Sequence, residues 1–161
     1  MKKVSGKTAE FEILKRFIIG YRKRFSIELN NINHRDKPDF EVSNPNTGEC
    51  FGIEVTGMYQ NEEEPKIQYG SIDKWDHFCG SIEELLSSLN IRLKDKARKS
   101  KSYNYCRRML LAIWLDSLIF TAKFDVDFIR NQIIIPDNNF SEIWLIIQSK
   151  DDTPELYPLR V

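Results

Sequence analysis

Residues 37–57, "KPDFEVSNPNTGECFGIEVTG", have the pattern of two short strands joined by a turn. The turn signal "NPNTGE" is centred between Asn46 and Thr47, and a hairpin closed there pairs residues whose numbers sum to 93. Asp39 then lies directly opposite Glu54. Because side chains alternate along a strand, these two carboxylates and Thr56 are predicted on one face of the hairpin. The other face is apolar and consists of Phe40, Val42, Ile53 and Val55.

The two opposed carboxylates need a compensating positive charge. Like charges directly opposite on neighbouring strands destabilise the pair by about a few tenths of a kcal/mol or more. A divalent cation such as Mg²⁺ would compensate Asp39 and Glu54, because Mg²⁺ prefers oxygen ligands. A lysine or arginine of the same chain would also compensate them. The hairpin by itself is compatible with both interpretations.

Two long helices are predicted from apolar residues at helical spacing. The second covers residues 81–100 and begins with a capping box formed by Ser81 and Glu84. The first covers residues 8–23, and its apolar stripe consists of Phe11, Leu14, Phe17, Ile18 and Tyr21.

Each helix turns one charged residue toward its apolar side. At 100° per residue, Glu10 falls within the stripe of the first helix and Lys96 within the stripe of the second. Charged residues on apolar stripes are rarely left unpaired. We therefore expect Glu10 and Lys96 to converge with Asp39 and Glu54 on one site. The alternative is that Glu10 and Lys96 lie at the stripe ends and extend to water.

The remaining elements complete one α/β domain that spans residues 1–161. A first strand is predicted over residues 25–29, and continuous apolar runs predict buried strands over 109–115 and 142–148. Residues 124–135 are predicted to be helical at their start. The order helix, three strands, helix, strand, helix, strand is typical of an α/β sandwich with a mixed sheet. The polar stretch over residues 57–80 carries no prediction.

The hairpin and the element order resemble the PD-(D/E)XK nuclease superfamily. "KPDF" followed by "GIEVT" is similar to the family motif of a PD on one hairpin strand and an E-x-K on the next. The resemblance covers residues 8–148 and implies a restriction endonuclease-like three-layer α/β core with a central mixed β-sheet flanked by helices. It also implies Mg²⁺ or Mn²⁺ held by Asp39, Glu54 and the Val55 carbonyl. Glu10 matches the first-helix acid of many members and would ligate a second metal or fix a bound water.

The chain departs from the family motif at one position. Thr56 stands where the family lysine is expected, and it has no charge to offer a phosphate or an attacking water. Some members place the lysine on the following helix, and Lys96 is the inward lysine there. The resemblance therefore predicts a metal-dependent nuclease whose catalytic residues are Glu10, Asp39, Glu54 and Lys96. The alternative is a catalytically inactive relative that binds nucleic acid or protein.

Basic residues are clustered although the formal net charge is zero, which argues against a protein that simply coats nucleic acid. Two thirds of the 24 lysines and arginines fall within residues 1–24 and 92–108. We expect the second cluster to hold a nucleic-acid strand, with DNA favoured over RNA, although solvated helix faces are an equal alternative. A homodimer or a protein partner is also expected for so small a nuclease. The predicted contacts are Arg92, Lys99, Lys101, Arg107 and Arg108.

The location of the chain is predicted from what its sequence lacks. There is no apolar run near eighteen residues and no signal-peptide pattern at the N-terminus, so we expect a cytoplasmic protein without a membrane partner. The three cysteines are widely spaced and form no CxxC pair, which predicts free thiols rather than a zinc site or a disulfide framework.

Overall fold

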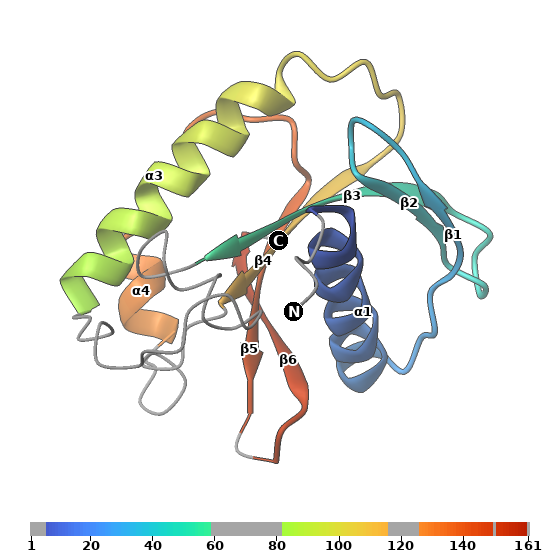
Figure 1. The fold of residues 1–161 in the computed structure, drawn as a ribbon, viewed down its shortest axis with the longest axis horizontal. Helices are drawn as coiled ribbons and strands as arrows, with labels where there is room; N and C mark the ends of the chain where they lie inside the picture. Colours follow the sequence, from blue (N-terminus) through green and yellow to red (C-terminus); the bar gives the residue numbers. More distant parts are fainter. Residues whose placement is uncertain (1–5, 59–81, 116–125, 150, 161) are drawn as a thin grey trace, which may run out of the picture.

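The computed structural model describes residues 6–58, 82–115, 126–149 and 151–160. Three helices and six strands lie within these residues, and Figure 1 shows their arrangement. In chain order they are α1 (Gly6–Phe25), β1 (Asn30–His34), β2 (Phe40–Ser43), β3 (Cys50–Met58), α3 (Ile82–Ser100), β4 (Met109–Leu115), α4 (Val126–Gln132), β5 (Glu142–Gln148) and β6 (Pro154–Arg160).

The six strands form one mixed sheet in which spatial order follows chain order, β1-β2-β3-β4-β5-β6. Strands β1, β2 and β3 are antiparallel neighbours, and β4 and β5 run parallel to β3. Strand β6 returns antiparallel to β5. The parallel β3 and β4 are connected through α3, as parallel neighbours require a crossover. The predicted α/β class with a mixed sheet is confirmed.

The hairpin of β2 and β3 has the predicted register. Phe40 pairs with Ile53 and Ser43 with Cys50, so the partner numbers sum to 93 along the whole ladder. The turn is closed by a hydrogen bond from the Gly48 backbone N–H to the Asn44 carbonyl oxygen over 2.8 Å. Gly48 adopts a positive φ of 75°, which glycine tolerates without a steric penalty. This register fixes which hairpin side chains face each helix layer.

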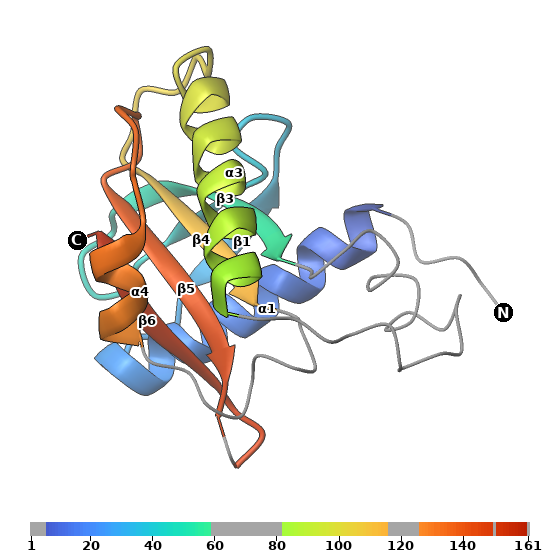
Figure 2. The same cartoon turned by 90° about the vertical axis from the view of Figure 1, so that its left-hand side faces the viewer.

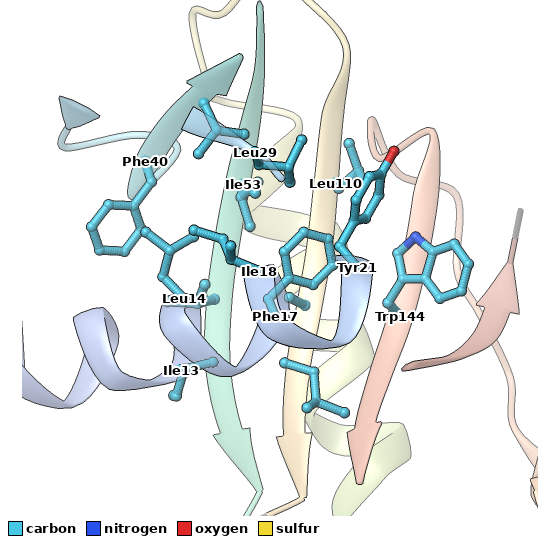
Figure 3. Packing of buried hydrophobic residues seen from close by; sticks show 14 of the residues in the cluster. Ile13, Leu14, Phe17, Ile18, Tyr21, Leu29, Phe40, Ile53, Leu110 and Trp144 are labelled. Atoms are coloured by element: carbon cyan, nitrogen blue, oxygen red, sulfur yellow. The ribbon is translucent and has the colours of Figure 1, made fainter. Parts of the chain in front are cut away.

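Helix α1 packs on one face of the sheet and forms the first apolar core. Figure 3 shows Leu14, Phe17 and Tyr21 directed at Ile53 of β3 and at Trp144 of β5. Leu14 and Phe17 are fully buried, as the helical stripe predicts. Phe11, at the beginning of the stripe, remains 39% exposed. The predicted first helix is therefore confirmed, with its apolar contacts concentrated in its central and C-terminal turns.

Helices α3 and α4 cover the opposite face of the sheet. Leu89 and Leu93 of α3 pack against the alternate residues of β4, such as Leu111, in a second core. Figures 1 and 2 show α3 and α4 together on the side of the sheet that α1 does not cover. The chain thus has three layers, helix, sheet and helix pair. Within the described part of the chain, no helix combines the length and the apolar content of a membrane span.

Two predictions about the strands were wrong or incomplete. The strand predicted over residues 25–29 does not form, because Phe25 is the last residue of α1 and packs on Tyr21 and Trp144. Ser26 then adopts a φ of 57° and ends the helix, and the first strand begins at Asn30. Strand β6 was not predicted at all. The strands over 109–115 and 142–148 and the helix at 82–100 are confirmed, while Ser81 of the predicted capping box lies outside the described residues.

Gly52 of β3 allows Pro38 and Tyr105 to lie directly against the sheet, next to the opposed carboxylates. A Cβ at this position would lie 2.5 Å from Pro38 Cγ and 2.8 Å from Tyr105 Cε1. These separations are shorter than van der Waals contact, so any larger residue has to displace Pro38 and the Tyr105 ring. The absence of a side chain at Gly52 thereby allows Pro38 and the Tyr105 ring to approach β3 closely.

We expect Gly52→Ala to lower the free energy of unfolding by about 1–3 kcal/mol, because it overpacks this contact. A double-mutant cycle in urea with Tyr105→Ala should return a coupling of about 1 kcal/mol, since removing the ring relieves part of the overlap. Gly48→Ala is the control for the coupling: its cost comes from the positive φ of Gly48, and no atom lies within 4 Å of the Cβ it would add, so it should not couple to Tyr105→Ala. An equal coupling of Tyr105→Ala with both glycine variants would contradict this account.

Candidate active site

Glu54 of β3 is a buried carboxylate on the sheet face that α3 covers. It is only 3% exposed, and it accepts hydrogen bonds at both oxygens. Its Oε1 accepts from Lys96 Nζ over 2.7 Å and from the Tyr103 hydroxyl over 2.9 Å, and its Oε2 accepts from the Asp39 backbone N–H over 3.2 Å. These three donors come from α3, from the segment that follows α3 and from the start of the hairpin. They compensate the burial of a charged group.

Asp39 lies just before β2 and opposite Glu54, as the register predicts. Its Oδ2 accepts the Val55 backbone N–H over 2.9 Å, and among the described residues no donor reaches its Oδ1. Burial raises the pKa of the Asp39 carboxyl from 3.8 to about 7, with the neighbouring charge of Glu54 as the second cause. The hydrogen bond from Val55 and the charge of Lys96 lower this pKa only in part. Asp39 is therefore the undercompensated member of the pair.

Lys96 is the lysine that α3 directs onto the sheet. Its side chain is 13% exposed, and its ammonium forms the ion pair with Glu54. Lys94, Arg98 and Lys99 of the same helix are all exposed. The helical projection thus identified the inward lysine correctly, and the site contains Asp39, Glu54 and Lys96 within one hydrogen-bonded group.

Glu10 does not join this hydrogen-bonded group. It belongs to α1, which packs on the other face of the sheet, and its Oε2 lies 3.7 Å from His34 Nε2. Its side chain remains 38% exposed. The charge of Glu10 nevertheless contributes to raising the pKa of Asp39. Glu10 therefore lies close enough to act on Asp39 through its field, but it makes no direct contact with it.

Tyr103 is a member of the site that the sequence did not indicate. It follows α3 in a segment without regular structure, where no periodicity assigns a direction to a side chain. Its hydroxyl donates to the same Glu54 oxygen as Lys96. Burial and the charge of Glu54 raise the pKa of the Tyr103 hydroxyl well above its usual value, so it remains a donor at neutral pH.

The predicted nucleic-acid contacts lie on the protein surface, and most of them pair with carboxylates of the chain. Arg92 is half-buried on α3. The other four predicted contacts form the ion pairs Lys99–Asp95, Lys101–Asp137, Arg107–Glu41 and Arg108 with Glu49 and Glu142, at 2.8–3.2 Å.

Thr56 lies two residues after Glu54 on β3, where the resemblance led us to expect a lysine. It is buried beside the site at 8% exposure.

The carboxylate and carbonyl oxygens of this site are suited to a metal ion that takes few of its ligands from the protein. Among the described residues, no three His, Cys, Asp or Glu side chains are grouped closely enough to hold a metal ion. Mg²⁺, however, is usually held by one or two carboxylates, with waters and substrate phosphates filling the other positions. The N–H and C=O of a strand residue point to the same side. The Val55 carbonyl therefore points past the beginning of β2, on the side where its N–H meets Asp39.

The chain was compared with protein-family models, with curated proteins and with solved structures, and none of them matches it.

We expect Lys96→Met to lower the free energy of unfolding by about 3 kcal/mol, because it leaves the buried Glu54 carboxylate without its cation. Chemical denaturation at pH 7 measures this loss. Lys94→Met, an exposed lysine two residues earlier on α3, is the matched control and should change stability by less than about 0.5 kcal/mol. The double variant Glu54→Gln/Lys96→Met should recover part of the loss. Equal effects of the two lysine variants would disprove the buried ion pair.

The raised pKa of Asp39 predicts a specific pH dependence of stability. Between about pH 4 and pH 7 the folded chain retains a proton on Asp39 that the unfolded chain releases, so the contribution of Asp39 to stability falls as the pH rises. Asp39→Asn removes this titration. As the pH rises from about 4 to 7, the free energy of unfolding of Asp39→Asn should therefore increase relative to that of the wild type. The measurement is made in buffer that contains a chelator. A constant difference would contradict the electrostatic account.

Proposed function

We propose that this chain is a metal-dependent nuclease that hydrolyses phosphodiester bonds of DNA. The observation that carries the proposal is the 2.7 Å contact between Lys96 Nζ and Glu54 Oε1, on the sheet face where Asp39 stands opposite Glu54. A lysine and two carboxylates grouped on one sheet face are what the resemblance to the PD-(D/E)XK superfamily leads us to expect. Here α3 provides the lysine, since position 56 of β3 is a threonine.

The element order supports the same proposal. Helix α1, the antiparallel strands β1, β2 and β3, the helix α3 and the parallel strand β4 follow one another as in the restriction endonuclease-like core. The two carboxylates lie at the strands that carry the motif in that core. We therefore assign this chain the restriction endonuclease-like fold as part of the proposal.

Asp39, Glu54 and the Val55 carbonyl are the residues that would hold Mg²⁺ or Mn²⁺. When bound, such an ion lowers the pKa of a coordinated water and neutralises charge on a phosphate. Asp39 Oδ1 has no donor within the described residues. Burial and the charge of Glu54 raise the pKa of Asp39, and a divalent cation bound there would lower it. Glu10 lies farther out, beside His34, and its role would be to hold a water at the edge of the site.

Lys96 supplies the positive charge that the chemistry requires from the protein itself. Its ammonium has three N–H donors, and among the described residues Glu54 Oε1 is the one acceptor that it contacts. In the proposed reaction the other two N–H groups orient an attacking water and donate to a phosphate oxygen as negative charge develops on it. Tyr103 shares the same oxygen of Glu54 and holds that carboxylate in one orientation. The lysine is thereby positioned before any substrate binds.

A second candidate function is binding without catalysis. It is favoured by Thr56 at the family lysine position and by the ion pairs that occupy four of the five predicted nucleic-acid contacts. In that case Lys96 only neutralises the buried Glu54 carboxylate, and the fold serves as an interaction module.

Calorimetric titration of Mg²⁺ and Mn²⁺ followed by cleavage assays tests the proposal. The wild type should bind either metal saturably and cleave plasmid or single-stranded DNA. Asp39→Asn should lose metal binding, and its cleavage rate should fall by about 10³-fold or more, because Asp39 has the carboxylate oxygen left open for the ion. Lys96→Met should retain part of the metal affinity and lose cleavage.

Two variants serve as controls for these losses. Glu12→Gln removes a carboxylate from α1 that pairs with Lys15 at the surface, and Lys94→Met removes an exposed lysine from α3. Both should bind metal and cleave like the wild type. If the wild type binds neither metal at millimolar concentration, the nuclease proposal is wrong and the second candidate is favoured.

A further inference from the structure

A pocket of about 240 Å³ lies next to the candidate active site. It is lined by Arg35, Glu41, Asn104, Tyr105, Cys106 and Arg107. Among these residues, the sequence had indicated only Arg107 as a possible contact for nucleic acid.

The pocket lies one step along the hairpin from the opposed carboxylates. Glu41 follows Asp39 by two residues, so both side chains leave the same face of the chain, about 7 Å apart. Tyr105 likewise follows Tyr103 by two residues. The Tyr105 hydroxyl donates to Glu41 over 2.7 Å, as the Tyr103 hydroxyl donates to Glu54. The spacing of about 7 Å between Asp39 and Glu41 along the chain is on the scale of one nucleotide in an extended strand.

Two guanidinium groups share the single carboxylate of this pocket. Arg35 lies 3.7 Å and Arg107 lies 3.2 Å from the Glu41 oxygens, and the arginine side chains are 42% and 50% exposed. The Glu41 side chain is only 17% exposed and also accepts from Tyr105, so its oxygens are occupied. Each guanidinium has five N–H donors, and in each it is Nη1 that lies within ion-pair distance of Glu41. The cluster retains one net positive charge.

Arg35 is held in place by an aromatic ring as well as by Glu41. Its guanidinium lies over the Tyr105 ring at 5.0 Å, and the Tyr105 ring is seated close to Gly52, where a Cβ would collide with it. A fixed planar guanidinium favours bidentate recognition of phosphate. Arg108 differs, because it is balanced by both Glu49 and Glu142 and packs over Phe51.

We propose that the pocket binds the internal phosphate that neighbours the scissile phosphodiester on the same strand. Arg35 and Arg107 donate to that phosphate, and Glu41 and Tyr105 hold the two guanidinium groups in position. The inference rests on the proposed nuclease function. It assigns the position of the DNA strand, with one phosphate at Asp39, Glu54 and Lys96 and the next phosphate at Arg35 and Arg107.

Binding of a fluorescein-labelled single-stranded DNA oligonucleotide, measured by anisotropy in chelator so that no cleavage occurs, tests the pocket. Arg35→Gln and Arg107→Gln should each weaken binding about tenfold and reduce the salt slope by about one. Arg22→Gln, which removes a surface arginine of α1 that pairs with Glu28, is the matched control and should change affinity less than twofold. Circular dichroism and thermal unfolding establish that the variants are folded.

A second arm replaces single phosphates of the oligonucleotide by neutral methylphosphonates. With the wild type, neutralising the neighbouring phosphate should weaken binding about tenfold, and with Arg35→Gln/Arg107→Gln the same change should have little further effect. If both arginine variants bind like Arg22→Gln, or if the methylphosphonate effect persists in the double variant, the pocket inference is wrong. If the wild type never cleaves DNA with Mg²⁺ or Mn²⁺, the nuclease proposal fails, and the register assigned to the strand fails with it.

Discussion

The burial of the Glu54 carboxylate within the sheet is the constraint on which the arrangement of the site depends. A charged group removed from water costs several kcal/mol unless cations and hydrogen-bond donors replace the solvent. Lys96, Tyr103 and the Asp39 backbone provide those donors from three separate parts of the chain. Satisfying one carboxylate therefore joins β3 to α3, to the segment after α3 and to the start of β2. The same contacts bring a lysine and a second carboxylate to one place.

The parts of the fold that follow from local rules could be predicted from the sequence. The turn residues set the hairpin register, and continuous apolar runs marked β4 and β5. The two edge strands lack such signals. Strand β1 is exposed along its whole length, and β6 contains two prolines, so neither shows the apolar alternation of a half-buried strand. Their formation depends on the ladders offered by β2 and β5, which are tertiary contacts.

The candidate site was predictable to a similar extent, and the limit was also physical. A helical projection gives the direction of a side chain relative to its own helix, but not the sheet face on which that helix packs. Lys96 was placed correctly because α3 covers the face that carries Glu54, whereas Glu10 belongs to the opposite layer and stays 38% exposed. Charge counting had a related limit. It located the basic residues but not the carboxylates that neutralise Lys99, Lys101 and Arg108.

The cation that pairs with the buried carboxylate comes from α3 and not from β3. Thr56 lies two residues after Glu54 and on the same face, so a lysine there would approach the carboxylates from within the strand. Lys96 approaches the same face from the helix packed above it and reaches Glu54 Oε1 at 2.7 Å. What the electrostatics require is a cation on that face, whichever element provides it. The two carboxylates differ in their surroundings, because Glu54 accepts from Lys96 and Tyr103, while among the described residues no donor reaches Asp39 Oδ1.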